Sequence, residues 1–120
     1  MIMDKELFGV CPFATAQRLI QGKWAVLILH HLSEGATRFN ELQRKMPKMT
    51  HATLAAQLKQ LEAEGLVIRR EYPQIPPKVE YSLSEMGRKF EPVLDSIRAW
   101  GTEYIQYMKE KETAGLTEGE

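Results

Sequence analysis

The stretch Thr37–Leu83 reads TRFNELQRKMPKMTHATLAAQLKQLEAEGLVIRREYPQIPPKVEYSL and contains four predicted elements in a meaningful order. The first is a short amphipathic helix over Asn40–Met46, for which Asn40 is a suitable cap because its side chain accepts hydrogen bonds from unpaired N–H groups. This helix must end at Pro47, since proline lacks an N–H and disfavours helical angles in the residue before it.

A second helix is predicted over His51–Glu64. Thr50 is its expected N-cap, and Gly65 supplies the left-handed residue that ends many helices. Its apolar residues recur at helical spacing, so one face belongs in a core. These residues are Leu54, Leu58 and Leu61.

Two strands, Leu66–Tyr72 and Lys78–Leu83, complete the stretch and are joined by the proline-rich turn Pro73–Pro77. Apolar residues alternate with polar ones along both strands, so Leu66, Ile68 and Tyr72 are expected on one half-buried face. Helix, turn, helix and hairpin is the order of a winged helix-turn-helix, which lays its second helix in a DNA major groove. The predicted fold is therefore mainly α with a small β-hairpin wing.

The face of the second helix opposite its leucines is small and polar in its first half. This face suits close approach to base edges, although a solvated helix face has the same composition. The hairpin that follows favours DNA binding, because a solvated face does not require one. Basic residues in the wing would meet phosphates or a narrow minor groove. The predicted DNA-binding residues are Arg38, Thr50, His51, Ala52, Thr53, Ala56, Gln57, Lys59, Arg69, Arg70 and Lys78.

Size and composition are those of an ordinary soluble protein. At 120 residues the chain predicts one domain over residues 1–120, with its core at 11–108 and a flexible tail at 109–120. The net charge is zero, but residues 38–81 carry eight Lys or Arg and five Glu, a balance of +3 where DNA would bind. We expect a cytoplasmic protein, because the chain has no secretion signal, no membrane span and one cysteine.

Cys11 directly precedes Pro12, and proline favours the first position of a helix, so Cys11 is the expected cap of an N-terminal helix. Amide groups at a helix N-terminus favour the reactive thiolate, although a small core residue would fit the position equally well. Further along, His30 and His31 are adjacent and no carboxylate or cysteine completes a metal site there, so we predict no metal.

The longest periodic apolar stretch begins after Pro92. A stripe of this length is more than a three-helix core needs, so we expect it to pack against a second copy of the chain with two-fold symmetry. Packing on the chain's own core is the alternative. The predicted dimer residues are Val93, Leu94, Ile97, Trp100, Tyr104 and Met108.

The chain resembles the HxlR-type transcriptional regulators, winged-helix DNA-binding dimers related to the MarR group. The resemblance rests on CPFATAQRLIQGKWAVLILHHL, RFNELQRKMP, LAAQLKQLEAEGLVIRREYPQIPPKVEYSLSEMG and IRAWG, with YPQIPPKVEYSL as its most specific part. It implies a homodimer held by the N- and C-terminal helices. It also implies that Cys11 senses oxidants or electrophiles, as a cysteine before this proline does in several members. Relatives often have longer polar residues where this chain has Ala52 and Ala56.

The resulting prediction is a homodimeric transcriptional regulator on an inverted-repeat operator, with double-stranded DNA, a second copy of the chain and a small oxidant or electrophile as its partners. The alternative is a winged-helix module that binds protein and no DNA. An enzyme is not expected, because neither a base at motif spacing beside Cys11 nor a cofactor motif is present, and no cofactor is predicted.

Overall fold

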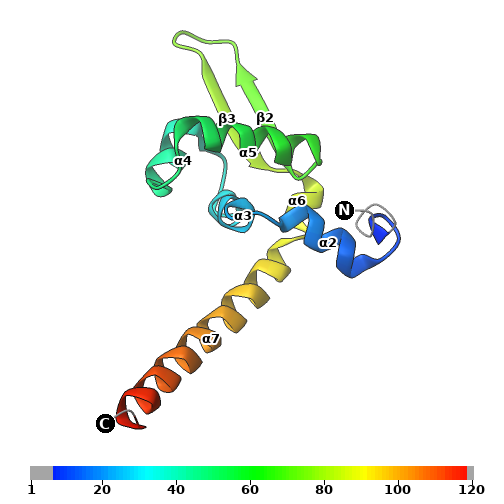
Figure 1. Cartoon of the computed structure of the whole chain (residues 1–120). Coiled ribbons are helices and arrows are strands. Elements are labelled where there is room, and N and C mark those ends of the chain that lie inside the picture. The colour runs from blue at the N-terminus through cyan, green and yellow to red at the C-terminus, as the bar shows by residue number, and fades with distance from the viewer. Residues whose placement is uncertain (1–6, 119–120) are drawn as a thin grey trace. The chain divides into compact units, whose positions relative to one another are not determined.

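The computed structural model describes residues 7–118, which form two compact units, one ending at residue 88 and the other beginning at residue 89 (Figure 1). The first unit contains most of the secondary structure. Its elements are α2 (Pro12–Ile20), α3 (Ala25–Ser33), β1 (Thr37–Arg38), α4 (Phe39–Lys45), α5 (His51–Ala63), β2 (Val67–Tyr72), β3 (Lys78–Leu83) and α6 (Glu85–Arg88). The second unit is α7 (Glu91–Glu118). This is the predicted winged helix-turn-helix.

The hairpin forms part of a three-stranded antiparallel sheet in the order β1-β3-β2. Figure 1 shows the β2–β3 hairpin extending beyond α5 as the wing. The short strand β1 was not predicted, because its two residues carry no strand pattern. It exists through pairing distant in sequence, in which Thr37 lies opposite Tyr81.

The core of the first unit lies between the helices and one face of the sheet, where α3 packs against β3 and α5 against β2. The leucines Leu54, Leu58 and Leu61 of α5 are buried as predicted. Thr50 caps this helix as expected, since its Oγ1 accepts a hydrogen bond of 3.1 Å from the Thr53 N–H.

The end of α5 is closed by a Schellman motif. Gly65 has a φ of +81°, and its N–H donates to the carbonyl of Glu62. The Leu66 N–H donates to the carbonyl of Leu61 at 3.0 Å, so two backbone carbonyls of the last turn are satisfied by this motif. Leu66, expected as the first residue of the strand, is buried and precedes β2, which begins at Val67.

Three sequence-based predictions need correction in this unit. Asn40 is not the cap of α4, because the helix begins at Phe39 and the Arg38 N–H donates to Glu41 Oε1 at 3.1 Å. Ile68 is 43% exposed, because pairing of Val67 with Leu83 turns those two residues to the core and Ile68 to the opposite face. Leu27 falls at core spacing with Trp24, Ile28 and Leu32 and was therefore expected to be buried, but it is exposed.

The loop after the wing is fixed by Ser84 and Gly87. Ser84 Oγ accepts a hydrogen bond from the Gly87 N–H at 3.0 Å and donates one to the Gly65 carbonyl at 2.6 Å. A Cβ on Gly87 would lie 2.2 Å from the Leu66 carbonyl oxygen, so no side chain fits there. The hairpin is thus tied to the end of α5.

The helix α7 starts near Pro92, as predicted, and continues to Glu118. The tail was expected to fray from residue 109, but no proline occurs beyond Pro92 and residues 102–114 contain no glycine, so nothing in the sequence breaks the helix there. At 1.5 Å per residue its 28 residues extend about 42 Å. Among the described residues, no helix is both long and apolar enough to cross a membrane.

Candidate nucleic-acid interface

The first turn of α5 presents a polar end held in place by two threonines. Thr50 Oγ1 accepts from the Thr53 N–H and lies 2.8 Å from Thr53 Oγ1. The His51 ring packs against Phe39 of α4, with ring centroids 4.4 Å apart. These contacts fix the first turn of α5 against α4, so its outward side chains have a defined position.

The face of α5 opposite its leucines is exposed and small. Of the predicted residues, Ala52, Ala56 and Lys59 lie on this face, and His51 is exposed at the start of the helix. Ala55 lies there too and was missed by the sequence-based reasoning. A helix with alanine at three exposed positions can approach another surface closely, because no long side chain intervenes.

Gln57 occupies a different environment from the other predicted readers. It is half-buried and lines a cavity of about 250 Å³ with α2 residues that include Arg18 and Leu19. Glu64 lines the same cavity, and one of its carboxylate oxygens is buried without a hydrogen-bond partner in the described part of the chain. The structure thus places Gln57 beside α2, apart from the exposed alanines.

The basic residues of the wing lie on two faces of the sheet. Arg69 and Arg70 are neighbours in β2 and therefore point to opposite faces. Arg69 forms an ion pair with Glu71, and this hydrogen bond raises the pKa of the guanidinium further above its ordinary value. Lys78 is paired with Glu80, with Nζ 3.3 Å from Oε2.

The charge of the wing is therefore partly neutralised by its own carboxylates. Glu80 also accepts a hydrogen bond from the Tyr72 hydroxyl at 3.2 Å, and the Lys78 Nζ lies 4.6 Å from the centre of the Tyr72 ring. Arg70 forms no ion pair within the described residues and is exposed. The sequence predicted the same role for Arg69, Arg70 and Lys78. In the structure, Arg69 and Lys78 pair with carboxylates, whereas Arg70 has no such partner among the described residues.

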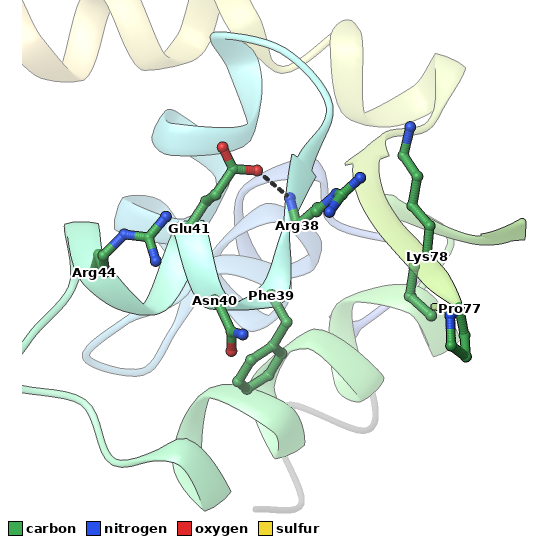
Figure 2. A pocket seen from close by; sticks show the side chains of 8 residues that line it. Arg38, Phe39, Asn40, Glu41, Arg44, Pro77 and Lys78 are labelled. Atoms are coloured by element: carbon green, nitrogen blue, oxygen red, sulfur yellow. Dashed lines mark hydrogen bonds between the residues drawn. The ribbon is translucent and has the colours of Figure 1, made fainter. Parts of the chain in front are cut away.

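Arg38 lies at the junction of β1 and α4, where it lines a second cavity with Lys78. Figure 2 shows this cavity together with Asn40 and Arg44, which were not among the predicted residues. No local sequence signal marks them, because the cavity is formed by segments more than 30 residues apart in the chain.

A family model described as HxlR-like helix-turn-helix matches residues 19–109. The chain belongs to this family. The HTH-type transcriptional regulator YdeP of Bacillus subtilis is 43% identical over 111 residues, covering 92% of this chain and 87% of YdeP. This HxlR-like chain is thus a DNA-binding transcriptional regulator of the helix-turn-helix type.

Two solved structures of redox-related regulators are similar to this HxlR-like chain. The redox regulator HypR in its oxidized form is 44% identical, with a TM-score of 0.73, over 78% of this chain and 96% of HypR. The reduced form of the transcriptional regulator YodB from B. subtilis is 34% identical, with a TM-score of 0.71, over 79% of this chain and 94% of YodB. Both similarities confirm the winged-helix fold.

The helix α7 of the HxlR-like chain exposes most of the apolar residues predicted for the dimer. Trp100 is 66% exposed and Tyr104 45%, and their rings stack with centroids 5.2 Å apart. Ile105 and Tyr107, which the sequence-based reasoning missed, are exposed as well. Val93, Ile97 and Met108 are also exposed, whereas Leu94 is buried.

Cys11 stands at the N-cap of α2, as predicted. Its N–H donates to the Leu7 carbonyl at 2.8 Å, and its side chain makes no capping hydrogen bond. The side chain is half-buried, so it is neither a packed core residue nor fully in solvent. The family match begins at residue 19, so it does not extend to Cys11.

Proposed function

We propose that the chain regulates transcription as a homodimer on an inverted-repeat operator, with α5 in the major groove and the wing along the flanking backbone. The observation that carries this proposal is the first turn of α5, which combines a fixed cap with an exposed, small outer face. A recognition helix needs both, because its base contacts require defined positions and close approach.

The reading chemistry follows from the side chains at this turn. The Thr53 hydroxyl oxygen lies 2.8 Å from Thr50 Oγ1, so one of the two hydroxyls donates within the pair and the other hydroxyl proton is available to a base. The methyl groups of Ala52 and Ala56 suit contact with thymine methyls. Gln57 would reach a base only by leaving its cavity beside α2. We therefore propose a reading set centred on Thr50, His51 and Thr53, with Lys59 toward the backbone.

The exposed stripe of α7 supports the dimer. Its apolar residues Val93, Ile97, Trp100, Tyr104 and Tyr107 recur at alternating steps of four and three. This is the heptad spacing with which two helices pack side by side. Two copies of α7 would bury this stripe and join two copies of α5 in one molecule, which an inverted repeat requires. The N-terminal helix α2, whose Phe13 is 86% exposed, is proposed to contribute to the same contact.

Cys11 is the proposed sensor of oxidants or electrophiles in this dimer. It is the single thiol of the chain, it precedes a helix, and HypR is a redox regulator of the same fold. With one thiol per chain, a disulfide could form only between two Cys11 residues, and the alternative is addition of an electrophile to the thiolate. Modification of Cys11 would shift α2, and this shift would act on α5 because Arg18 of α2 and Gln57 of α5 line the same cavity.

Thr53→Glu tests the DNA proposal, because it places a negative charge at the reading turn. Ala63→Glu is the matched control, since it adds the same charge at the far end of the same helix. With a promoter fragment upstream of the protein's own gene, we expect the Thr53 variant to lose specific binding in a fluorescence anisotropy assay and the Ala63 variant to retain it. Binding of the native protein that does not change with salt would contradict the proposal and favour a protein-binding module.

Diamide tests the proposed role of Cys11. Diamide oxidises two thiols to a disulfide and is itself reduced to the hydrazine. We expect it to change the operator affinity of the native dimer, to yield a disulfide-linked dimer on non-reducing gels, and to leave Cys11→Ser unaffected. A quinone, which adds to one thiolate, distinguishes addition from a disulfide. Equal responses of the native protein and Cys11→Ser would show that Cys11 only fills space.

A further inference from the structure

A cavity of about 730 Å³ lies between the first turn of α4 and the returning strand of the wing (Figure 2). Its walls come from segments that are far apart in the sequence and are brought together by pairing of β1 with β3. The cavity is lined by Arg38, Phe39, Asn40, Glu41, Arg44, Pro77, Lys78 and Val79.

The lining of this cavity has more positive than negative side chains. It contains three cations and one carboxylate, Glu41, and one oxygen of that carboxylate already accepts the Arg38 backbone N–H at 3.1 Å. Figure 2 shows Glu41 between the Arg38 and Arg44 side chains in this view. Within the described residues, no carboxylate lies at ion-pair distance from the guanidinium group of either arginine.

Both guanidinium groups line the cavity without an ion-pair partner among the described residues, so both can bind an anion that enters it. Guanidinium groups bind phosphate oxygens through two parallel hydrogen bonds, so they suit a phosphate group in particular. Lys78 has a flexible side chain that now pairs with Glu80 and can exchange this partner for a phosphate.

The cavity belongs to the same surface as the reading turn of α5. Phe39 lines the cavity and packs against His51 with ring centroids 4.4 Å apart. A duplex read by the first turn of α5 would therefore bring its backbone to this side of α4. Contacts to the backbone of this kind fix the register of the protein on DNA without reading sequence.

We propose that this cavity binds one phosphate group, held by Arg38 and Arg44 and joined by Lys78. This inference rests on the proposed DNA binding for its favoured source, a phosphodiester of the DNA backbone next to the bases that α5 reads. A free phosphate or phosphomonoester offers the same oxygens and is the second source. Arg44 is the residue that this proposal adds to the interface.

The test compares Arg44→Gln with Lys45→Gln in the full-length protein. Both variants remove one positive charge from neighbouring positions of α4, but Lys45 lies outside the cavity and pairs with Glu34, with Nζ 3.4 Å from Oε1. We measure binding to a fluorescent 30-base-pair duplex of mixed sequence across a series of salt concentrations. For Arg44→Gln we expect the slope of log affinity against log salt to fall by about 1, with affinity about tenfold lower near 0.1 M salt, and for Lys45→Gln less than half of this change.

A second arm uses the DNA-free protein and inorganic phosphate at low ionic strength, followed by the amide NMR signals of residues 38–44 and 78. Saturable shifts in the native protein that Arg44→Gln removes would identify free phosphate as a ligand and support the site. Equal salt slopes for the two variants, together with no saturable shifts, would overturn the inference and leave the proposed DNA binding intact. If the native protein shows no salt-dependent DNA binding, the proposed function fails, and the phosphate titration alone decides whether the cavity is an anion site.

Discussion

The first compact unit and the helix α7 differ in where their apolar side chains lie. In the first unit, Ile28, Leu42 and Leu58 are at most 1% exposed, and the ends of α5 are closed by Thr50 and Gly65. In α7, the large side chains of Trp100 and Tyr104 are about half exposed or more. The first unit buries a core of apolar side chains, whereas most of the apolar side chains along one stripe of α7 are exposed.

This difference indicates which parts of the molecule are complete within one copy of the chain and which need a second copy. The winged helix-turn-helix has its core, its caps and its exposed reading turn within one copy of the chain. A contiguous exposed apolar stripe is typical of a surface that meets another protein. We therefore expect substitutions in the first unit to change stability at any protein concentration, and substitutions in the stripe to change association.

Leu58→Ala and Ile97→Ala give the largest expected contrast. Leu58 is buried in the core, so its truncation is expected to lower the free energy of unfolding by about 2–5 kcal/mol, through lost burial and a residual cavity. Ile97 is exposed, so its truncation is expected to leave the unfolding of a dilute sample nearly unchanged and to reduce the rise in melting temperature with protein concentration. Urea and thermal unfolding at several concentrations measure both effects.

Equal losses in the two variants at every concentration would contradict this division of the molecule. Val93→Ala tests the same stripe at its first turn and is expected to follow Ile97→Ala with a smaller effect, because it lies nearer the end of the stripe.

A smaller expected effect is the pH dependence of the unfolding free energy, which arises from a residue of the first unit. The pKa of His31 in α3 lies below its ordinary value of 6.5, chiefly because burial disfavours the imidazolium, with nearby His30 and Lys45 adding to this and Glu34 opposing it. The unfolded chain then binds a proton as pH falls through 6.5, before the folded chain does. Stability contributed by the neutral ring is full above pH 6.5 and is lost as pH falls from there toward the lowered pKa.

We therefore expect the unfolding free energy of the native protein to decline below about pH 6.5, and that of His31→Asn to decline less. Chemical denaturation from pH 8 to pH 5 measures the difference. The same decline in both proteins would assign the pH dependence to other groups.

Local signals in the sequence predicted the parts of the fold that depend on neighbouring residues. The Thr50 cap, the left-handed Gly65 and the bounds of β3 depend on interactions within a few residues, and the structure confirms them. Strand β1 and the exposed position of Ile68 could not be predicted in this way. Both depend on the register between strands, and a change of one residue in register reverses the face of every side chain.

In the candidate interface, too, some features depend on neighbouring residues and could be predicted, and others depend on distant segments and could not. The exposed positions of Ala52 and Ala56 in α5 follow from helical periodicity, and both lie where the sequence placed them. The position of Gln57 beside α2, the pairing of Lys78 with Glu80 and the cavity that contains Arg44 depend on segments far apart in the chain. These features emerged only from the tertiary structure.

Sedimentation velocity at micromolar concentration tests most directly the claim that the stripe of α7 joins two copies of the chain. The double variant Ile97→Glu with Trp100→Glu places two charges in the stripe, and Asp95→Glu with Glu103→Asp is a control that changes neighbouring exposed positions without changing charge. We predict a dimer for the native protein and the control, and a monomer with unchanged helix content for the charged variant. A native protein that sediments as a monomer, or a charged variant that remains a dimer, would contradict the account.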